Sequence, residues 1–182
     1  MTKSILKGLV LAGVGAFLLA APAAAQIKWH LGVGMNIPQG DLADENLGNA
    51  GTGFGVHGGG TFGLGTGPLA IKADAAWQSW GAGESDESFQ MIEVTADLVY
   101  NFGGEGKIKP YLLAGGGWDQ LSASDDSFDA TSSFAFNGGA GLNFALGGLG
   151  AFLEARYVMA PFSIEGTDYD MDNIPIVFGL RF

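Results

Sequence analysis

The sequence predicts an all-β fold, an eight-stranded antiparallel up-and-down transmembrane β-barrel. The first observation is the strict alternation of the last nine residues, which suits a strand with one face in lipid. Large apolar residues occupy every second position there: Ile174, Ile176, Phe178, Leu180 and Phe182. The second observation is that this period of two recurs in eight segments, with no convincing helical period after residue 26. The third is a composition of 32 glycines and 15% charged residues, against about 25% charged in a typical soluble domain.

The first four expected strands follow one another with the same alternation. Residues 27–37 alternate Ile, Trp, Leu, Val and Met with Lys, His, Gly and Asn. Residues 53–62 place Phe and Val opposite His and Thr, and residues 69–78 place Leu, Ile, Ala and Trp opposite Lys, Asp and Gln. Residues 89–102 alternate Ile, Val, Ala, Leu, Tyr and Phe with Met, Glu, Thr, Asp and Asn. Each strand is therefore expected to turn its larger apolar face to lipid.

The last four expected strands vary more in pattern. Residues 108–118 are apolar on parts of both faces, whereas residues 133–144 place Phe and Leu opposite Asn and Gly. Residues 149–158 place Leu, Ala and Tyr opposite Glu and Arg, and the final strand is residues 174–182. A tilted transmembrane β-strand needs about 9–11 residues, which these segments supply. An even number of antiparallel strands brings both termini of the barrel domain to the same side of the membrane.

The connections fall into a short class and a long class, as the periplasmic turns and extracellular loops of bacterial barrels do. Three short turns and four long loops alternate along the chain: 63–68, 103–107 and 145–148 are short, and 38–51, 79–88, 119–130 and 160–172 are long. Aromatic residues are expected to form one girdle at each rim. The expected girdles are Phe62, Phe102, Phe144 and Phe182 at the short-turn rim, and Trp77, Trp80, Trp118 and Tyr157 at the long-loop rim. A soluble lipocalin-like barrel is disfavoured, because its outer face would be glycine-rich and poor in charge.

The first 25 residues resemble a cleavable signal peptide. Lys3 and Lys7 precede an apolar run over residues 9–20, and small residues at 23–25 offer a cleavage site before Gln26. We expect residues 1–25 to be removed, residues 26–182 to form one barrel domain, and the protein to lie in the cell outer membrane. The chain has no cysteine, which excludes a disulfide scaffold. A net charge of −11 argues against nucleic-acid binding.

Charged residues inside the expected strands all fall on the inward face. Because an Arg or Lys facing lipid at mid-depth costs about 2–4 kcal/mol, inward pairing is favoured. An eight-stranded barrel has an interior that side chains can fill, so these residues are expected to form a packed ion-pair network rather than a pore. In particular, Glu154 and Arg156 should pair with inward carboxylates and with Lys72 or Arg181. The inward ionisable residues are Lys28, His30, His57, Lys72, Asp74, Glu93, Asp97, Glu154, Arg156 and Arg181.

No catalytic set emerges from the sequence, and we expect no enzymatic activity. His30 and His57 are the two imidazoles, and neither is followed by a nearby serine as in lipid A deacylases. Residues 53–58 match G-x-G-x-x-G, but a nucleotide site needs a helix after the motif, and here more strand follows. These glycines are better explained by a tightly curved barrel wall.

The four long loops carry fourteen carboxylates and no Lys or Arg. These residues are Asp41, Asp44, Glu45, Glu84, Asp86, Glu87, Asp119, Asp125, Asp126, Asp129, Glu165, Asp168, Asp170 and Asp172. They predict an acidic rim, which can serve solubility and repulsion between loops. Alternatively they bind divalent cations, and the alternating Asp168, Asp170 and Asp172 are the best candidates for calcium ligands, although no EF-hand loop is present. No other cofactor is expected.

Three local motifs resemble the small eight-stranded outer-membrane β-barrel family of the OmpX, opacity-protein and OmpA transmembrane-domain type. They are Gly34-Met35-Asn36-Ile37-Pro38, Pro110-Tyr111 with Gly115-Gly116-Gly117-Trp118, and Glu154-Ala155-Arg156-Tyr157, in that order before a terminal Phe182. Members are mostly envelope, adhesion or host-interaction proteins, and a few are lipid-modifying enzymes. The resemblance implies a structural or surface-interaction role, with a narrow solute channel as the alternative and a lipid-modifying enzyme as a third option. The expected partners are outer-membrane lipid, the barrel-assembly machinery through Phe182, and a surface ligand or divalent cation at the loops.

Overall fold

The structure is a computed structural model. It describes residues 27–45, 49–81, 88–103, 106–123, 130–146, 148–164 and 166–182. The expected signal peptide lies outside these residues, so its cleavage stays a prediction. Within the described residues, no helix is long and apolar enough to cross a membrane.

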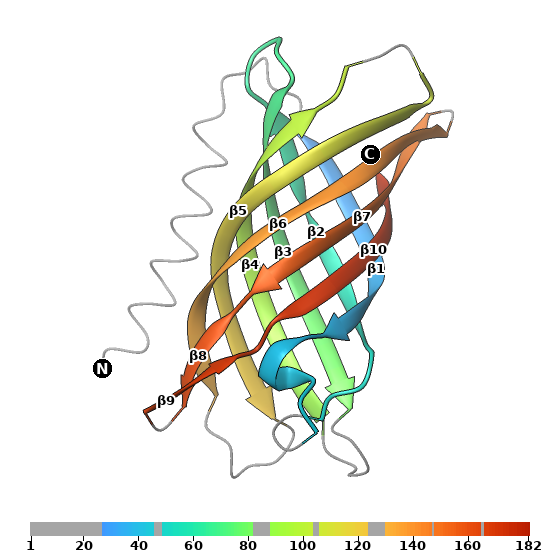
Figure 1. Cartoon of the computed structure of the whole chain (residues 1–182). Helices are drawn as coiled ribbons and strands as arrows, with labels where there is room; N and C mark the ends of the chain where they lie inside the picture. The colour runs from blue at the N-terminus through green and yellow to red at the C-terminus, as the bar shows by residue number, and fades with distance from the viewer. Residues whose placement is uncertain are drawn as a thin grey trace, which may run out of the picture.

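Eight long strands close into an antiparallel barrel, which confirms the predicted fold class (Figure 1). Each strand pairs with its neighbours in sequence, and the first pairs with the last, where Val33 lies opposite Phe178. Backbone hydrogen bonds of 2.9 Å in both directions between Trp29 and Phe182 complete the seam. The strands are β1 (Lys28–Pro38), β2 (Gly53–Gly63), β3 (Leu69–Gly81), β4 (Ser88–Asn101), β5 (Ile108–Ala123), β6 (Thr131–Leu146), β7 (Leu149–Met159) and β10 (Asn173–Arg181).

The long-loop end carries more regular structure than the sequence indicated. Strand β3 runs three residues and β5 five residues beyond the expected ends, because both continue to pair with β4. The first long loop contains a short 3-10 helix, η1 (Gly40–Leu42), and the last contains a hairpin of β8 (Pro161–Ile164) and β9 (Thr167–Asp170). The hairpin extends beyond the barrel wall at the long-loop end (Figure 1).

The outer wall of the barrel is apolar, as a lipid-facing surface requires. The expected girdle residues Trp77, Trp118 and Tyr157 are all exposed on this wall, as are Phe102 and Phe182 at the other rim. Other large apolar side chains continue the surface between the rims. They include Leu31, Val33, Ile92, Leu98, Leu112, Leu142, Leu153, Phe178 and Leu180.

The expectation for Trp80 was wrong, because this side chain points inward and is 1% exposed. It lies three residues after Trp77, so the alternation of the strand sends the two rings to opposite faces. Trp80 belongs to an apolar cluster inside the long-loop end of the barrel, which we call the outer cluster. Its members are Leu42, Ala50, Trp80, Met91, Leu121, Ala135, Val158, Ala160, Phe162 and Met171.

The segment that matched G-x-G-x-x-G lies within β2 and is followed by further strand, which confirms the structural explanation of these glycines. Elsewhere in the wall, one glycine makes room for a large inward side chain. A Cβ atom at Gly141 would lie 2.3 Å from Cζ of Tyr111, the residue opposite it on β5. The absence of a side chain at this position therefore lets the Tyr111 ring lie across the neighbouring strand.

Candidate functional site

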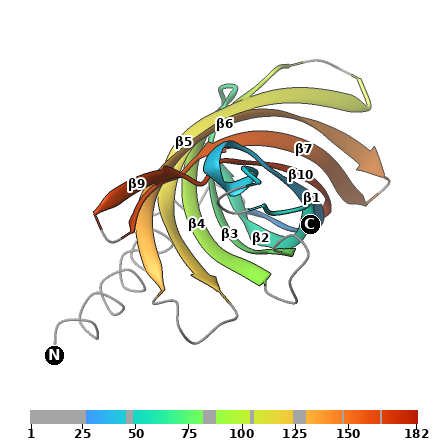
Figure 2. The ribbon, with the colours of Figure 1, turned by 60° about the horizontal axis from the view of Figure 1, so that its bottom comes forward.

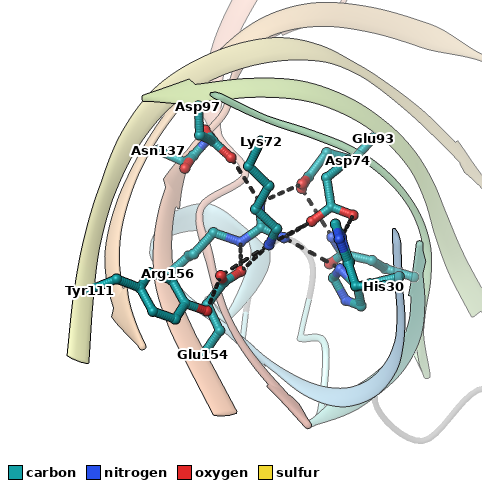
Figure 3. Close-up of polar contacts among 11 residues, drawn as sticks. His30, Lys72, Asp74, Glu93, Asp97, Tyr111, Asn137, Glu154 and Arg156 are labelled. Atoms are coloured by element: carbon teal, nitrogen blue, oxygen red, sulfur yellow. Dashed lines mark hydrogen bonds and ion pairs between the residues drawn. The ribbon is translucent and has the colours of Figure 1, made fainter. Parts of the chain in front are cut away.

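A buried network of charged and polar side chains occupies the middle of the barrel. Figure 3 shows these side chains converging from opposite walls toward Arg156 and Lys72. They come from seven of the eight barrel strands, each from an inward position of the alternation. The members are His30, His57, Lys72, Asp74, Glu93, Asp97, Tyr111, Asn137, Glu154 and Arg156, and each is at most 5% exposed.

Arg156 contacts four carboxylates at once. Its Nε atom lies 3.2 Å from Glu154 Oε1, and Nη2 lies 3.3 Å from Asp74 Oδ2. Nη1 lies 3.5 Å from Glu93 Oε1 and 3.7 Å from Asp97 Oδ2. A planar guanidinium with several donors suits such a position better than an ammonium group.

Lys72 is the second cation of the network and joins two of the same carboxylates. Its Nζ lies 2.9 Å from Asp74 Oδ2 and 2.7 Å from Glu154 Oε1. Tyr111 donates its hydroxyl to Glu154 Oε2 at 2.6 Å, and His30 Nε2 lies 3.1 Å from Asp74 Oδ1. These contacts confirm the predicted pairing of Glu154 and Arg156 with inward carboxylates and Lys72.

Amide side chains donate hydrogen bonds to the other two carboxylates of the network, Asp97 and Glu93. Asn137 donates to Asp97 Oδ1 at 2.9 Å, and Gln78 donates to Glu93 Oε2 at 3.1 Å. His57 Nδ1 lies 3.4 Å from Arg156 Nη2. Because every charged group here has partners, the network can fill the lumen at lower cost than isolated buried charges would incur.

The expectation that Asp119 belongs to the acidic rim was wrong. It lies on the extended part of β5, is fully buried, and faces Glu93 across the β4–β5 pair. Both of its carboxylate oxygens lack a hydrogen-bond partner in the structure. Buried polar atoms without a hydrogen-bond partner also occur in other inward side chains, among them Asn36, Gln78, Thr95 and Asn173. Along their strands, Asp119 and Gln78 lie between the ion-pair network and the outer cluster.

The outer cluster occupies the next inward positions toward the long loops. Along β7 the inward residues are Glu154, Arg156 and Val158 in that order, and along β4 the order is Asp97, Glu93 and Met91. Leu42 of η1 joins the cluster from the loop and is 1% exposed. Figure 2 looks toward this end, where η1 lies at the opening of the ring of strands. Apolar side chains therefore cover the network on the long-loop side.

The opposite end of the lumen is open. A vestibule of about 1040 Å³ lies within the short-turn rim, and the inward residues Lys28 and Arg181 line it. Arg181 donates to Asn143 rather than joining a carboxylate of the network. Deeper in the barrel, a cavity of about 20 Å³ separates the vestibule from the network and is lined by residues that include Lys72, Tyr111 and Phe152. This space holds about one water molecule.

The three proposed calcium ligands occupy different local environments. Asp168 accepts a hydrogen bond of 2.5 Å from Ser163 across the β8–β9 hairpin. Asp172 accepts from the Tyr157 hydroxyl at 2.6 Å and from the Ala160 N–H at 3.1 Å. Among the residues that the structure describes, no three His, Asp or Glu side chains are placed to hold a metal ion. Calcium binding at Asp168, Asp170 and Asp172 stays a prediction.

Seven acidic residues of the long loops lie outside the described residues, namely Glu84, Asp86, Glu87, Asp125, Asp126, Asp129 and Glu165. Of the described ones, Asp41 connects two loops, because its Oδ2 accepts a 2.8 Å hydrogen bond from the Asp170 N–H. The contact depends on Gly40, whose φ is +58° and where a Cβ atom would lie 2.5 Å from the Asp170 carbonyl oxygen.

Sequence reasoning missed the outer cluster and the part that Tyr111 plays. Met91, Leu121 and Val158 each lie two residues from a polar inward residue of the same strand. The alternation of strand faces could therefore have placed these three apolar side chains inside the barrel. Tyr111 and Asp119 are separated by an even number of positions on β5, so alternation places them on the same face of that strand. The insertion of Leu42 depends on a loop conformation that no strand periodicity encodes.

Comparison with known proteins supports the same architecture. A family model described as "Outer membrane protein beta-barrel domain" matches residues 9–182. Neisserial surface protein A is similar over 87% of this chain and 97% of its own, with 15% identity and a TM-score of 0.68. A major outer membrane protein from Thermus thermophilus is similar over 86% of this chain and 99% of its own, with 10% identity and a TM-score of 0.60. At these identities the likeness concerns the fold alone, and a search of curated proteins found no significant match.

Proposed function

The chain belongs to the outer membrane protein beta-barrel domain family, and we propose that it is a closed anchor in the outer membrane whose acidic long-loop rim binds positively charged partners. The observation that carries this proposal is the closure of the lumen beneath a rim whose described part carries exposed carboxylates. A filled lumen leaves the loops as the part of the barrel that can meet partners outside the cell.

The described parts of the first and last long loops are held together by contacts between residues that are far apart in sequence. Asp41 within η1 accepts a hydrogen bond from the Asp170 N–H of β9, and the Gln39 N–H donates to the Asp172 carbonyl oxygen at 2.8 Å. Phe162 of β8 is buried in the outer cluster, which attaches the hairpin to the barrel. Loop segments that are fixed by such contacts lose less conformational entropy on binding than free loops do, so these contacts favour a recognition role.

Charge decides the kind of partner that the rim would attract. Glu45, Asp168 and Asp170 are exposed, and the described parts of the long loops contain no Lys or Arg. Carboxylates of one sign on one rim steer cationic ligands toward it and repel anionic ones. A basic peptide segment or a divalent cation fits this surface.

We expect a labelled decalysine peptide to bind the barrel in phosphatidylcholine nanodiscs and to bind a Glu45→Gln/Asp168→Asn/Asp170→Asn variant about tenfold more weakly. The estimate assumes roughly 0.5 kcal/mol for each exposed charge pair that is lost. Fluorescence anisotropy at fixed ionic strength measures both affinities. Lys107→Gln, at the opposite rim, is the control and should leave the affinity unchanged. Equal affinities for the wild type and the triple variant would overturn the proposed rim function.

Closure of the lumen predicts that the barrel does not conduct ions. In a planar bilayer in 1 M KCl, the purified protein should insert without producing discrete conductance steps, because apolar side chains and paired charges leave no continuous water path. Insertion is checked by the heat-dependent gel mobility of the barrel recovered from the same preparation. Reproducible steps from inserted wild-type protein would contradict the closed anchor and favour the narrow-channel alternative.

A further inference from the structure

The vestibule at the short-turn rim concentrates the positive charge of the barrel. Residues 26–182 contain six Lys and Arg residues, of which Lys72 and Arg156 are held in the central network. The other four all line the vestibule, and they are Lys28, Lys107, Lys109 and Arg181. No Asp or Glu side chain lines it among the described residues.

The four cations lie on two opposite sides of the rim. Lys28 is on β1 and Arg181 on β10, which pairs with β1, while Lys107 and Lys109 lie just before and within β5. In the ring of eight strands, β5 is four strands away from β1 in either direction, so Lys28 and Arg181 start from one wall and Lys107 and Lys109 from the opposite wall. The lining of the remaining strands is uncharged and includes Thr61 and Asn101. The vestibule therefore has cations on two opposite walls, separated by uncharged lining.

Hydrogen bonding positions one of these cations. Arg181 donates through Nη1 to Asn143 Oδ1, and Asn143 lies opposite Lys109 in the β5–β6 register. Lys28 lies opposite Thr61 in the β1–β2 register. Lys28, Lys107 and Lys109 are exposed, and none of them has a carboxylate partner among the described residues. In the network, by contrast, each cation is neutralised by at least two carboxylates.

We propose that this vestibule is a binding site for a phosphate-bearing anion on the periplasmic side of the membrane. Several cations around one concave opening focus a positive potential, and both guanidinium and ammonium groups bind phosphate oxygens. The opening is wide enough for more than one phosphate group, and the narrow cavity below it stops a ligand short of the network. Two sources supply this chemistry at the short-turn rim, a free phosphorylated solute and the headgroup of an anionic phospholipid.

The test compares charge removal with charge conservation at the two exposed inward lysines. Lys28→Gln/Lys109→Gln removes two charges, and Lys28→Arg/Lys109→Arg keeps them. Both lysines are exposed, so neither substitution is expected to change stability by more than about 0.5 kcal/mol. Gel mobility confirms that each variant is folded before binding is measured.

The soluble arm uses inorganic pyrophosphate, titrated by calorimetry into the barrel in a zwitterionic detergent, with sodium chloride at matched ionic strength as the reference. The lipid arm uses native mass spectrometry to count phosphatidylglycerol and phosphatidylcholine molecules retained from a mixed micelle. We expect at least one anion to bind the wild type saturably. The Gln variant should bind it at least about tenfold more weakly, and the Arg variant should bind within about twofold of the wild type.

Each outcome has a defined meaning. Pyrophosphate binding lost in the Gln variant supports a soluble phosphorylated ligand, and selective loss of phosphatidylglycerol supports a lipid headgroup. Binding that is equal in all three proteins, or no preference for either anion over its reference, would overturn the site. Decalysine binding at the opposite rim is measured separately, so failure of this site leaves the rim proposal standing.

Discussion

Replacing Arg156 with methionine is expected to lower the free energy of unfolding by about 3–5 kcal/mol. The guanidinium lies within 3.7 Å of four carboxylates, each at most 3% exposed. Its removal leaves these negative charges buried with Lys72 as the nearest remaining cation. The measurement is urea unfolding of the barrel refolded into lipid vesicles, followed by tryptophan fluorescence and gel mobility.

Glu45→Gln is the control for this experiment, because Glu45 is an exposed carboxylate on the rim and its loss should change the unfolding free energy by no more than about 0.5 kcal/mol. The loss of unfolding free energy for Glu154→Gln should lie between those of Arg156→Met and Glu45→Gln, because this change weakens the contacts with Lys72 and Arg156 but keeps the shape of the side chain. If Arg156→Met and Glu45→Gln unfold at the same urea concentration, water must screen the lumen, and the closed anchor would then be wrong.

Replacing Trp80 with alanine should destabilise the barrel by about 3–5 kcal/mol, whereas the same change at Trp77 should cost about 0.5–1.5 kcal/mol. Trp80 is 1% exposed in the outer cluster, and its loss leaves a cavity among Met91, Leu121 and neighbouring side chains. Trp77 is 37% exposed on the lipid-facing wall and loses mainly its edge-on contact with Phe54, whose ring centre is 5.4 Å away.

The two tryptophan variants form a matched pair, because the residue type, the strand and the substitution are the same and the side of the wall is different. Unfolding free energies in the same vesicles measure the contrast. The Trp80→Ala barrel should also be tested for conductance, since it thins the outer cluster while keeping the ion-pair network. Equal losses at the two positions would show that Trp80 does not belong to a packed interior cluster.

The barrel architecture follows from the sequence alone, because membrane strands must satisfy every backbone hydrogen bond with neighbours and must keep one face apolar. These two requirements impose an alternation of apolar and polar residues along each strand, which can be recognised in the sequence without any knowledge of contacts. The same period placed His30, Lys72, Asp74 and Arg156 inside, since alternation assigns each residue to a face. The pairing of Glu154 and Arg156 with Lys72 followed from the cost of isolated buried charge.

Contacts between strands and loops determine which inward residues meet and what closes each end. Asp119 and Trp80 were assigned to loops or to the lipid face because the ends of β3 and β5 depend on pairing with β4, which local pattern does not report. The outer cluster joins residues from η1, five barrel strands and the β8–β9 hairpin. Likewise, Lys28, Lys107, Lys109 and Arg181 are dispersed through the sequence and share one vestibule because barrel closure places the ends of β1, β5 and β10 at one rim.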